Sequence, residues 1–311
     1  MSHPVIKASR ITYCLAETYA FVFNPFCNES LAEEENSVNP AMLTGWLSFD
    51  YYGFMEELTP EIIREGLATE FMGQNIVYFE SIGSTNEVAK ALAAKDAPEG
   101  TLVIAEEQTA GKGRLGRHWI APAGTSLLFS LLLYSDLTLE EVPRLIMLTC
   151  LATAEAIESV TGLPVRFKWP NDILIRGRKM GGVLTEVGVT GERLDYVVVG
   201  IGLNVNWDLS QVPELAGKAT SLSEELGREI CRLELLQRLL RYMEGGYLRL
   251  QEGYLPHNVF TSRLANLGEK VEVVLPRGKE EGLVEGVNAE GALLLRREDG
   301  TTVRVIMGEV T

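Results

Sequence analysis

The sequence has few cysteines and histidines, and it contains no long apolar run. Its four cysteines and three histidines lie far apart, without the spacing of a metal site or of a disulfide framework. No stretch approaches the roughly 18 apolar residues that a membrane span requires. Scattered cysteines in a chain of this size are typical of structural thiols in a reducing compartment, so we expect a cytoplasmic protein.

Positive charge is also scarce. The 311 residues include 28 lysines and arginines against 43 acidic residues, which gives a net charge of −15. This balance argues against general affinity for nucleic acid, which rests on cations that displace counterions. The hydrophobic content of 46% is ordinary for a globular protein, and the chain is long enough for a sizeable core and small appendages. A local concentration of cations is therefore informative.

One short segment, G-K-G-R-L-G-R at residues 111–117, holds three glycines and three cations. Backbone amides and side-chain charge together suit an anion, so the segment indicates phosphate or acyl-phosphate chemistry. It also matches the dinucleotide pattern G-x-G-x-x-G, but that site needs a helix that begins directly after the loop. Pro122 and Gly124 follow instead, so we do not expect a dinucleotide site.

The organised part of the chain is expected to begin near residue 58. Residues 1–57 carry two cations and eight acids, with a short strand expected at 49–54 and no helix-turn-helix pattern. Thr59, followed by proline, has the form of a helix start. Further along, the patterns predict strands at 75–80, 101–107 and 126–134, a β-meander between 165 and 200, and helices at 84–94, 139–160 and 224–252.

The C-terminal part of the chain has a different rhythm. Four short alternating runs, at 271–275, 282–287, 292–296 and 302–306, are separated by turn sequences. Short strands at this spacing predict a small antiparallel barrel.

A second cluster of motifs explains the cationic loop. R-F-K-W-P-N-D occupies residues 166–172, and R-K-M-G-G follows at 178–182. S-T-N lies upstream at 84–86, and G-I-G-L-N-V-N lies downstream at 200–206. In this order the motifs resemble the biotin protein ligase family, from about residue 58 to the C-terminus. Lys112 is a departure, because the family usually has arginine there; the ammonium keeps the charge but loses the planar two-donor fork, which affects the expected affinity for the biotinyl phosphate.

The resemblance implies an α+β fold. The expected catalytic domain spans residues 58–262 and has a mixed β-sheet with helices, like that of class II aminoacyl-tRNA synthetases. Residues 263–311 are expected to form an SH3-like β-barrel. Residues 1–57 are left as an N-terminal segment of unknown role, without a recognisable winged helix.

The resemblance also implies an activity. Members of the family form biotinyl-5'-AMP from biotin and ATP, with Mg²⁺, and transfer biotin to a lysine of a biotin carboxyl carrier protein or carrier domain. We therefore expect a ligase that binds ATP and biotin and modifies a carrier protein, with no DNA or membrane partner; the resemblance also allows a homodimer.

Carried over by motif position, Lys179 and Arg114 are the expected catalytic residues, with Lys179 bridging the biotin carboxyl oxygen and the phosphate. The expected biotin-binding residues are Ser84, Thr85, Asn86, Gln108, Gly111, Lys112, Gly113, Arg114, Trp119, Lys179 and Gly182. The expected ATP-binding residues are Arg114, Arg117, Lys168, Asn171, Asp172, Gly202 and Asn204. Magnesium would lie near Asp172.

Structural explanations compete with several of these roles. Ser84 and Glu87 have the spacing of a capping box, Lys179 could belong to a charged hairpin turn, and Asn171-Asp172 is a common turn pair. Two other activities are alternatives: a bifunctional ligase that also represses biotin synthesis through an N-terminal winged helix, and a lipoate–protein ligase, which shares the fold and a catalytic lysine.

Overall fold

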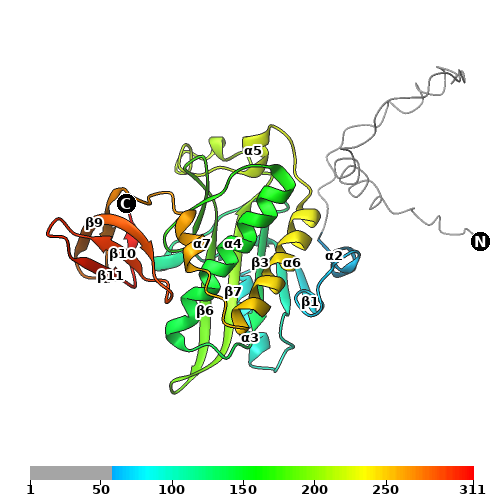
Figure 1. Ribbon diagram of the computed structural model, residues 1–311. Helices are drawn as coiled ribbons and strands as arrows, with labels where there is room; N and C mark the ends of the chain where they lie inside the picture. Colours follow the sequence, from blue (N-terminus) through cyan, green and yellow to red (C-terminus); the bar gives the residue numbers. More distant parts are fainter. Residues whose placement is uncertain (1–57) are drawn as a thin grey trace, which may run out of the picture. The chain divides into compact units, whose positions relative to one another are not determined.

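The computed structural model describes residues 58–311, which form an α+β fold with two sheets (Figure 1). The predicted short strand at 49–54 lies outside the described residues. The larger sheet has seven strands in the order β1-β2-β3-β7-β6-β5-β4. Its strands are β1 (Ile76–Ile82), β2 (Leu102–Gln108), β3 (Ser126–Leu133), β4 (Arg166–Lys168), β5 (Asp172–Ile175), β6 (Arg178–Thr190) and β7 (Arg193–Asn204).

The predicted mixed sheet is confirmed. Strands β1 and β2 pair in parallel, because helix α3 (Thr85–Ala93) lies between them in the chain and provides the crossover. The other neighbouring strands of this sheet pair antiparallel, and β4 to β7 form the predicted meander. The longest paired strands, β6 and β7, cross the middle of the sheet and carry the R-K-M-G-G and G-I-G-L-N motifs.

Helices cover both faces of this sheet. On β3, Leu131 and Leu133 belong to the main core cluster, whereas Leu132 packs with Ala89 and Ala93 of α3 on the opposite face. Because side chains alternate along a strand, this apolar run is buried on both sides. The main cluster is completed by two long helices that pack against each other, α4 (Val142–Thr161) and α6 (Arg232–Gln251).

The remaining helices are short. Helix α2 (Pro60–Arg64) begins as predicted, with Thr59 as its cap and proline in its first turn. The region 224–252, predicted to be mostly helix, is mostly helical but is not a single element. It is divided into α5 (Leu222–Leu226) and α6, because Gly227 adopts a left-handed φ of 67° that ends α5. The other elements are α7 (His257–Ser262) and the 3₁₀ turns η3 (Arg114–Gly116), η4 (Leu139–Glu141) and η5 (Leu209–Gln211).

The second sheet is antiparallel and C-terminal, as predicted. Its strand order is β11-β10-β9-β8-β12. The bounds are β8 (Lys270–Val274), β9 (Lys279–Val287), β10 (Leu293–Arg296), β11 (Thr302–Val305) and β12 (Glu309–Val310). No pattern in the sequence predicted β12, which has two residues. Both sheets belong to one compact unit, and the domain boundary at residue 263 stays a prediction. Within residues 58–311, none of the helices combines the length and apolar character needed to cross a membrane.

Candidate active site

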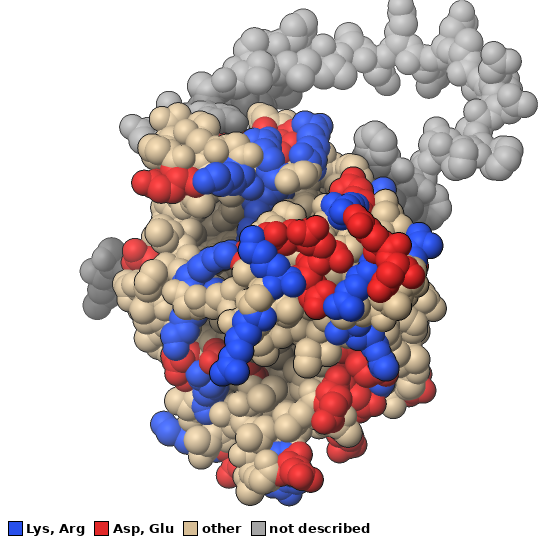
Figure 2. Space-filling model, turned by 90° about the vertical axis from the view of Figure 1, so that its left-hand side faces the viewer, with Lys and Arg blue, Asp and Glu red and all other residues tan. Residues whose placement is uncertain are grey.

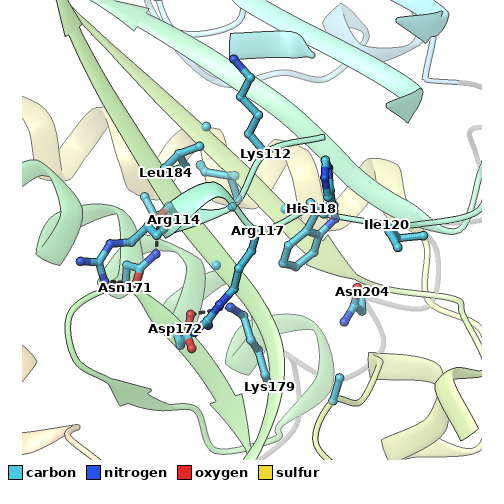
Figure 3. Close-up of a pocket in the computed structure, with 18 of the residues that line it drawn as sticks. Lys112, Arg114, Arg117, His118, Ile120, Asn171, Asp172, Lys179, Leu184 and Asn204 are labelled. Carbon is cyan, nitrogen blue, oxygen red and sulfur yellow. Dashed lines mark hydrogen bonds and ion pairs between the residues drawn. The ribbon is translucent and has the colours of Figure 1, made fainter. Parts of the chain in front are cut away.

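One cavity of about 460 Å³ collects nearly all of the predicted site residues. It lies over the middle strands of the larger sheet, beneath the cationic loop of residues 111–117 (Figure 3). The predicted residues that line it are Ser84, Thr85, Asn86, Gln108, Lys112, Gly113, Arg114, Arg117, Trp119, Lys168, Asn171, Asp172, Lys179, Gly182, Gly202 and Asn204. Gly111 is the exception. Segments far apart in the sequence thus meet at one site.

Gly111 and Gly202 have packing roles around Trp119. A Cβ atom on Gly111 would lie 2.5 Å from the carbonyl oxygen of Trp119, so the two backbone segments can approach only with glycine there. A Cβ on Gly202 would lie 2.8 Å from the indole ring. The ring therefore rests directly on β7 and forms part of the pocket wall.

The first turn of α3 provides a polar end of the pocket. Ser84, Thr85 and Asn86 are buried there, and the hydroxyl of Ser130 on β3 donates a hydrogen bond to Asn86 Oδ1 at 2.6 Å and lies 2.8 Å from Thr85 Oγ1. A Cβ on Gly200 would lie 2.2 Å from Asn86 Oδ1, so this glycine makes room for the amide. Hydroxyl and amide groups that are already oriented in this way suit a neutral polar ligand group.

The predicted capping box is wrong. Ser84 is the N-cap of α3, but its side chain makes no capping hydrogen bond. Gln108, at the end of β2, takes this role because its Oε1 accepts a hydrogen bond from Thr85 N at 2.8 Å. Glu87 pairs with Lys90 and Lys112 instead. The helix end is therefore fixed by a residue that also lines the pocket.

The cationic loop forms a tight bend rather than the start of a helix. Gly113 N donates to Arg117 O at 2.7 Å, and Leu115 at the tip has a φ of 56° and an exposed side chain. No long helix follows until α4, as expected from Pro122 and Gly124. The loop therefore presents its side chains on a short, glycine-rich turn over the pocket.

The two arginines of the loop contact the C-terminal sheet. Arg114 donates to Asn171 Oδ1 at 3.2 Å and to the carbonyl of Gly308 at 3.3 Å. Arg117 donates to Glu309 Oε1 at 2.7 Å. Burial lowers the pKa of Arg114, whereas the hydrogen bond with Arg117 holds the pKa of Glu309 below its usual value. Glu309 also lines the pocket, so the C-terminal strand completes this end of the site.

Lys179 lies in strand β6 and not in a hairpin turn. The turn comes just before it, at Arg176 and Gly177, where φ is positive. Lys179 Nζ is 2.6 Å from Asp172 Oδ1 and 5.9 Å from the centre of the Trp119 ring. In Figure 3 its ammonium points into the same region as the guanidinium of Arg117. Cations and one carboxylate thus meet beside an aromatic wall.

The backbone of Lys179 is held on both sides. Its strand pairs with Leu174 of β5, and on the other side Lys179 N donates to Lys218 O at 2.9 Å while Thr220 N donates to Lys179 O at 2.9 Å. The segment that approaches here also lines the pocket, through Val212 and Leu215.

A buried carboxylate strengthens this arrangement. The side chain of Glu225 on α5 is fully buried, and it forms ion pairs with Arg178 at 2.7 Å and Arg176 at 3.1 Å. It also accepts a hydrogen bond from Thr220 Oγ1 at 2.9 Å. Glu225 therefore joins the turn before Lys179 to the segment that pairs with Lys179. The sequence contained no motif that pointed to it.

Asn171 and Asn204 are buried and bonded to backbone. Asn171 Nδ2 donates to Val183 O at 2.6 Å, and Asn204 Nδ2 donates to Thr220 O at 3.2 Å. Both side chains also line the pocket. Their hydrogen bonds therefore fix neighbouring backbone segments of the pocket wall. Gly181 is buried, and a Cβ there would lie 2.5 Å from the Leu203 side chain, so glycine lets β6 and β7 pack closely at this point.

Several lining residues had no clear signal in the sequence. Ile120, Val212, Glu214, Leu215 and Glu309 add both apolar and acidic groups to the pocket. Trp207, just before the segment 208–220, also lines the pocket. Within the described part of the chain, no three histidine, cysteine or acidic side chains converge as a metal cluster.

Comparisons with known proteins agree with this geometry. The family model described as the biotin/lipoate A/B protein ligase family matches residues 78–204, and the biotin protein ligase C-terminal domain matches residues 267–311. The bifunctional ligase/repressor BirA of Bacillus spizizenii is 39% identical over 247 residues, which cover 78% of this chain and 76% of the relative. The chain belongs to the biotin protein ligase family. The family predicted from the motifs is therefore confirmed.

Two further relatives support the assignment of the ligase. The biotin–[acetyl-CoA-carboxylase] ligase of Mycobacterium tuberculosis is 31% identical over 82% of this chain and 97% of the relative. The biotin protein ligase of Aquifex aeolicus, solved with biotin and ATP, is 32% identical, with a TM-score of 0.67 over 76% of this chain and 98% of that chain. The α+β catalytic fold with a C-terminal antiparallel sheet is thus shared.

Proposed function

We propose that this ligase forms biotinyl-5'-AMP from biotin and ATP and transfers the biotinyl group to a lysine of a biotin carboxyl carrier protein. The observation that carries the proposal is the meeting of Lys179, Arg114 and Arg117 at one end of a pocket whose other end is polar and uncharged. Cationic side chains gather around a hollow on the face shown in Figure 2, although the whole chain carries a net charge of −15.

In the proposed binding mode, the ureido group of biotin lies at the polar end, beside Ser84, Thr85, Asn86 and Gln108. Trp119 forms the apolar wall for the ring system. The carboxylate then reaches the region of Lys179, with Gly182 beneath it, and the glycines of the loop permit close approach. The separation of a neutral polar end from a cationic end matches the two ends of biotin.

The proposed ATP site occupies the other side of the cationic end. Arg114, Arg117 and Lys168 would bind the phosphates, while Asn171, Gly202 and Asn204 would face the nucleotide. Asp172 is the predicted carboxylate nearest to Lys179, at 2.6 Å, and one carboxylate together with phosphates is a common environment for Mg²⁺. We therefore propose Asp172 as the residue that would hold Mg²⁺, which would neutralise phosphate charge when bound.

The first step joins two anions, so repulsion must be offset. An oxygen of the biotin carboxylate forms a bond to the α-phosphorus, and the bond from that phosphorus to the bridging oxygen breaks as pyrophosphate leaves. Lys179 stabilises the charge shared between the carboxylate and phosphate oxygens, as a compact ammonium can. In the second step the amine of the carrier lysine attacks the acyl carbon, AMP leaves, and the amine loses a proton as the amide forms.

The test is direct biotinylation. The protein is incubated with biotin, ATP, Mg²⁺ and a panel of carrier domains, including that of acetyl-CoA carboxylase, and modified lysines are identified by mass spectrometry. A carrier with its acceptor lysine changed to arginine is the control. We expect biotin on that lysine of at least one carrier. A parallel reaction contains lipoate in place of biotin; lipoylation there, or no modification in either reaction, would contradict the proposal. We also propose that the ligase is a cytoplasmic homodimer. The panel of carrier domains identifies the preferred carrier.

A second candidate function is repression, because the Bacillus spizizenii relative is named a bifunctional ligase/repressor. In this chain it would depend on residues 1–57, which lie outside the described residues and carry two cations against eight acids. We propose that this segment does not bind DNA specifically, since a winged helix needs several phosphate contacts from lysine and arginine. Anisotropy titration against DNA upstream of biotin-synthesis genes, with biotin and ATP present, should show no specific binding. Salt-sensitive nanomolar binding that is lost on removal of residues 1–57 would restore the repressor.

A further inference from the structure

The ammonium of Lys112 points away from the cationic end of the pocket. In Figure 3 its side chain extends away from Asp172, whereas Arg117 and Lys179 extend toward it. Lys112 Nζ instead forms an ion pair with Glu87 on α3. The position where relatives of the resembled family usually have arginine thus carries a lysine that is engaged outside the reacting region.

Glu87 connects the loop to a larger network of charges. It also pairs with Lys90 at 2.8 Å, Lys90 pairs with Glu186 of β6 at 2.7 Å, and Glu186 accepts a hydrogen bond from Asn86 Nδ2 at 2.8 Å. The hydrogen bonds from Lys112 and then Lys90 hold the pKa of Glu87 below its usual value. A series of ion pairs and one hydrogen bond therefore connects the loop to the buried amide of Asn86 in the pocket.

Lys112 lies at the base of the loop, where its restraint has the most effect. It forms a backbone bridge with His118, and Trp119 N donates to Gly111 O at 3.0 Å just beyond it. The tip between these ends is a glycine-flanked 3₁₀ turn that carries Arg114. A fixed base leaves only the tip to reorganise, so the loop closes with a smaller loss of conformational entropy.

We propose that Glu87 is a positioning residue that anchors the loop through Lys112, and that Lys112 acts as this anchor and not as a contact to the biotinyl phosphate. The inference rests on the proposed function, because the loop is taken to cover the adenylate. Both side chains are about half exposed, at 49% for Lys112 and 48% for Glu87. An exposed ion pair contributes little, so we expect changes of roughly threefold upon its loss.

The experiment compares Glu87→Gln, Lys112→Met and the double variant with wild type. Glu298→Gln, which removes the exposed pair with Lys270 in the C-terminal sheet, is the matched control. Three quantities are measured: the rate of pyrophosphate release, the dissociation rate of biotinyl-5'-AMP, and the rate of tryptic cleavage after Arg114, followed by mass spectrometry. We expect each single variant to release the adenylate and to be cleaved about threefold faster, with no further change in the double variant. Pyrophosphate release should be nearly unchanged in Glu87→Gln, which alters no residue of the pocket lining.

Several outcomes would overturn the anchor. Wild-type cleavage and retention in Glu87→Gln would show that the ion pair does not restrain the loop. Loss of the adenylate more than about tenfold faster in Lys112→Met than in Glu87→Gln would show that Lys112 contacts the ligand directly, as would additive effects in the double variant. If wild type formed no biotinyl-5'-AMP, the proposed function itself would fail, and the cleavage rates would still decide whether Glu87 anchors the loop.

Discussion

Lys179 and the arginines of residues 111–117 approach the same pocket, but they are held in different ways. Lys179 lies on a strand whose backbone is bonded on both sides, next to a turn fixed by the buried Glu225. Arg114 and Arg117 lie on a glycine-rich bend that is closed by its own backbone bonds and contacts the rest of the molecule through side chains. We propose that the difference corresponds to two roles: a rigid cation for bond formation and a lid that retains the intermediate.

Replacement of Lys179 should have the largest effect. Lys179→Ala removes the cation that we place between the biotin carboxylate and the α-phosphate, so adenylate formation should fall by at least about a hundredfold. Single-turnover pyrophosphate release measures this step. Lys218→Ala is the control, because its backbone pairs with Lys179 but its side chain is exposed outside the pocket lining. Near-normal pyrophosphate release from Lys179→Ala would refute the assignment.

Removal of the Glu225 charge should affect only the positioning of Lys179 and not the loop of residues 111–117. Glu225→Gln removes the charge from the buried partner of two partly exposed arginines, which should lower the free energy of unfolding by about 1.5 kcal/mol. In the folded fraction, adenylate formation should slow about tenfold while adenylate dissociation stays normal, since misplacement of a catalytic group is costly. Urea unfolding and single-turnover kinetics report the two effects. Faster dissociation with unchanged formation would instead place Glu225 with the lid.

Loss of an arginine from the lid should have the opposite effect to Glu225→Gln: faster dissociation of the adenylate with nearly normal formation. Arg114→Gly removes the bonds to Asn171 and Gly308 from the tip of the loop. We expect dissociation of the adenylate to become about tenfold faster, because these two long hydrogen bonds together contribute roughly 1.5 kcal/mol, and released adenylate should modify bystander lysines. Dissociation is followed by filtration of enzyme loaded with labelled biotin. Wild-type retention would show that Arg114 does not hold the lid.

The bridge between Arg117 and Glu309 should give the smallest effect, and it should depend on pH. The folded-state pKa of Glu309 lies below its unfolded value of about 4.5. Its contribution to stability is therefore fully present above that value and is lost as the pH falls through the lower folded-state pKa. At neutral pH, Glu309→Gln should lower Tm by no more than about 3 °C. The difference from wild type should shrink toward zero well below pH 4; a difference that persists there would have another cause.

Local patterns were enough to predict most of the fold. Alternating or continuous apolar runs placed the strands, and the motif containing Lys179 placed the centre of the site. Interactions between distant residues were not predictable in this way. Gln108 replaced the expected cap of α3 from the end of another strand, and Gly227 ended a helix whose apolar pattern continued beyond it.

The parts of the site that the sequence missed depend on tertiary contacts. Glu309 belongs to a strand of two residues, too short for any periodicity, and it reaches the loop because β12 pairs with β8. Glu225 resembles any other acid in a helical segment until its burial against two arginines is seen. Neither residue lies in a motif, so its role follows from the fold alone.

The division between rigid cation and lid is tested most directly by measuring synthesis and dissociation of biotinyl-5'-AMP side by side in wild type, Lys179→Ala and Arg114→Gly. Wild type should form the adenylate and retain it until a carrier domain is added. Lys179→Ala should form almost none, whereas Arg114→Gly should form it at a rate within a few-fold of wild type and release it rapidly. The account would be contradicted if Lys179→Ala formed adenylate normally but released it quickly, or if Arg114→Gly lost synthesis and kept normal retention.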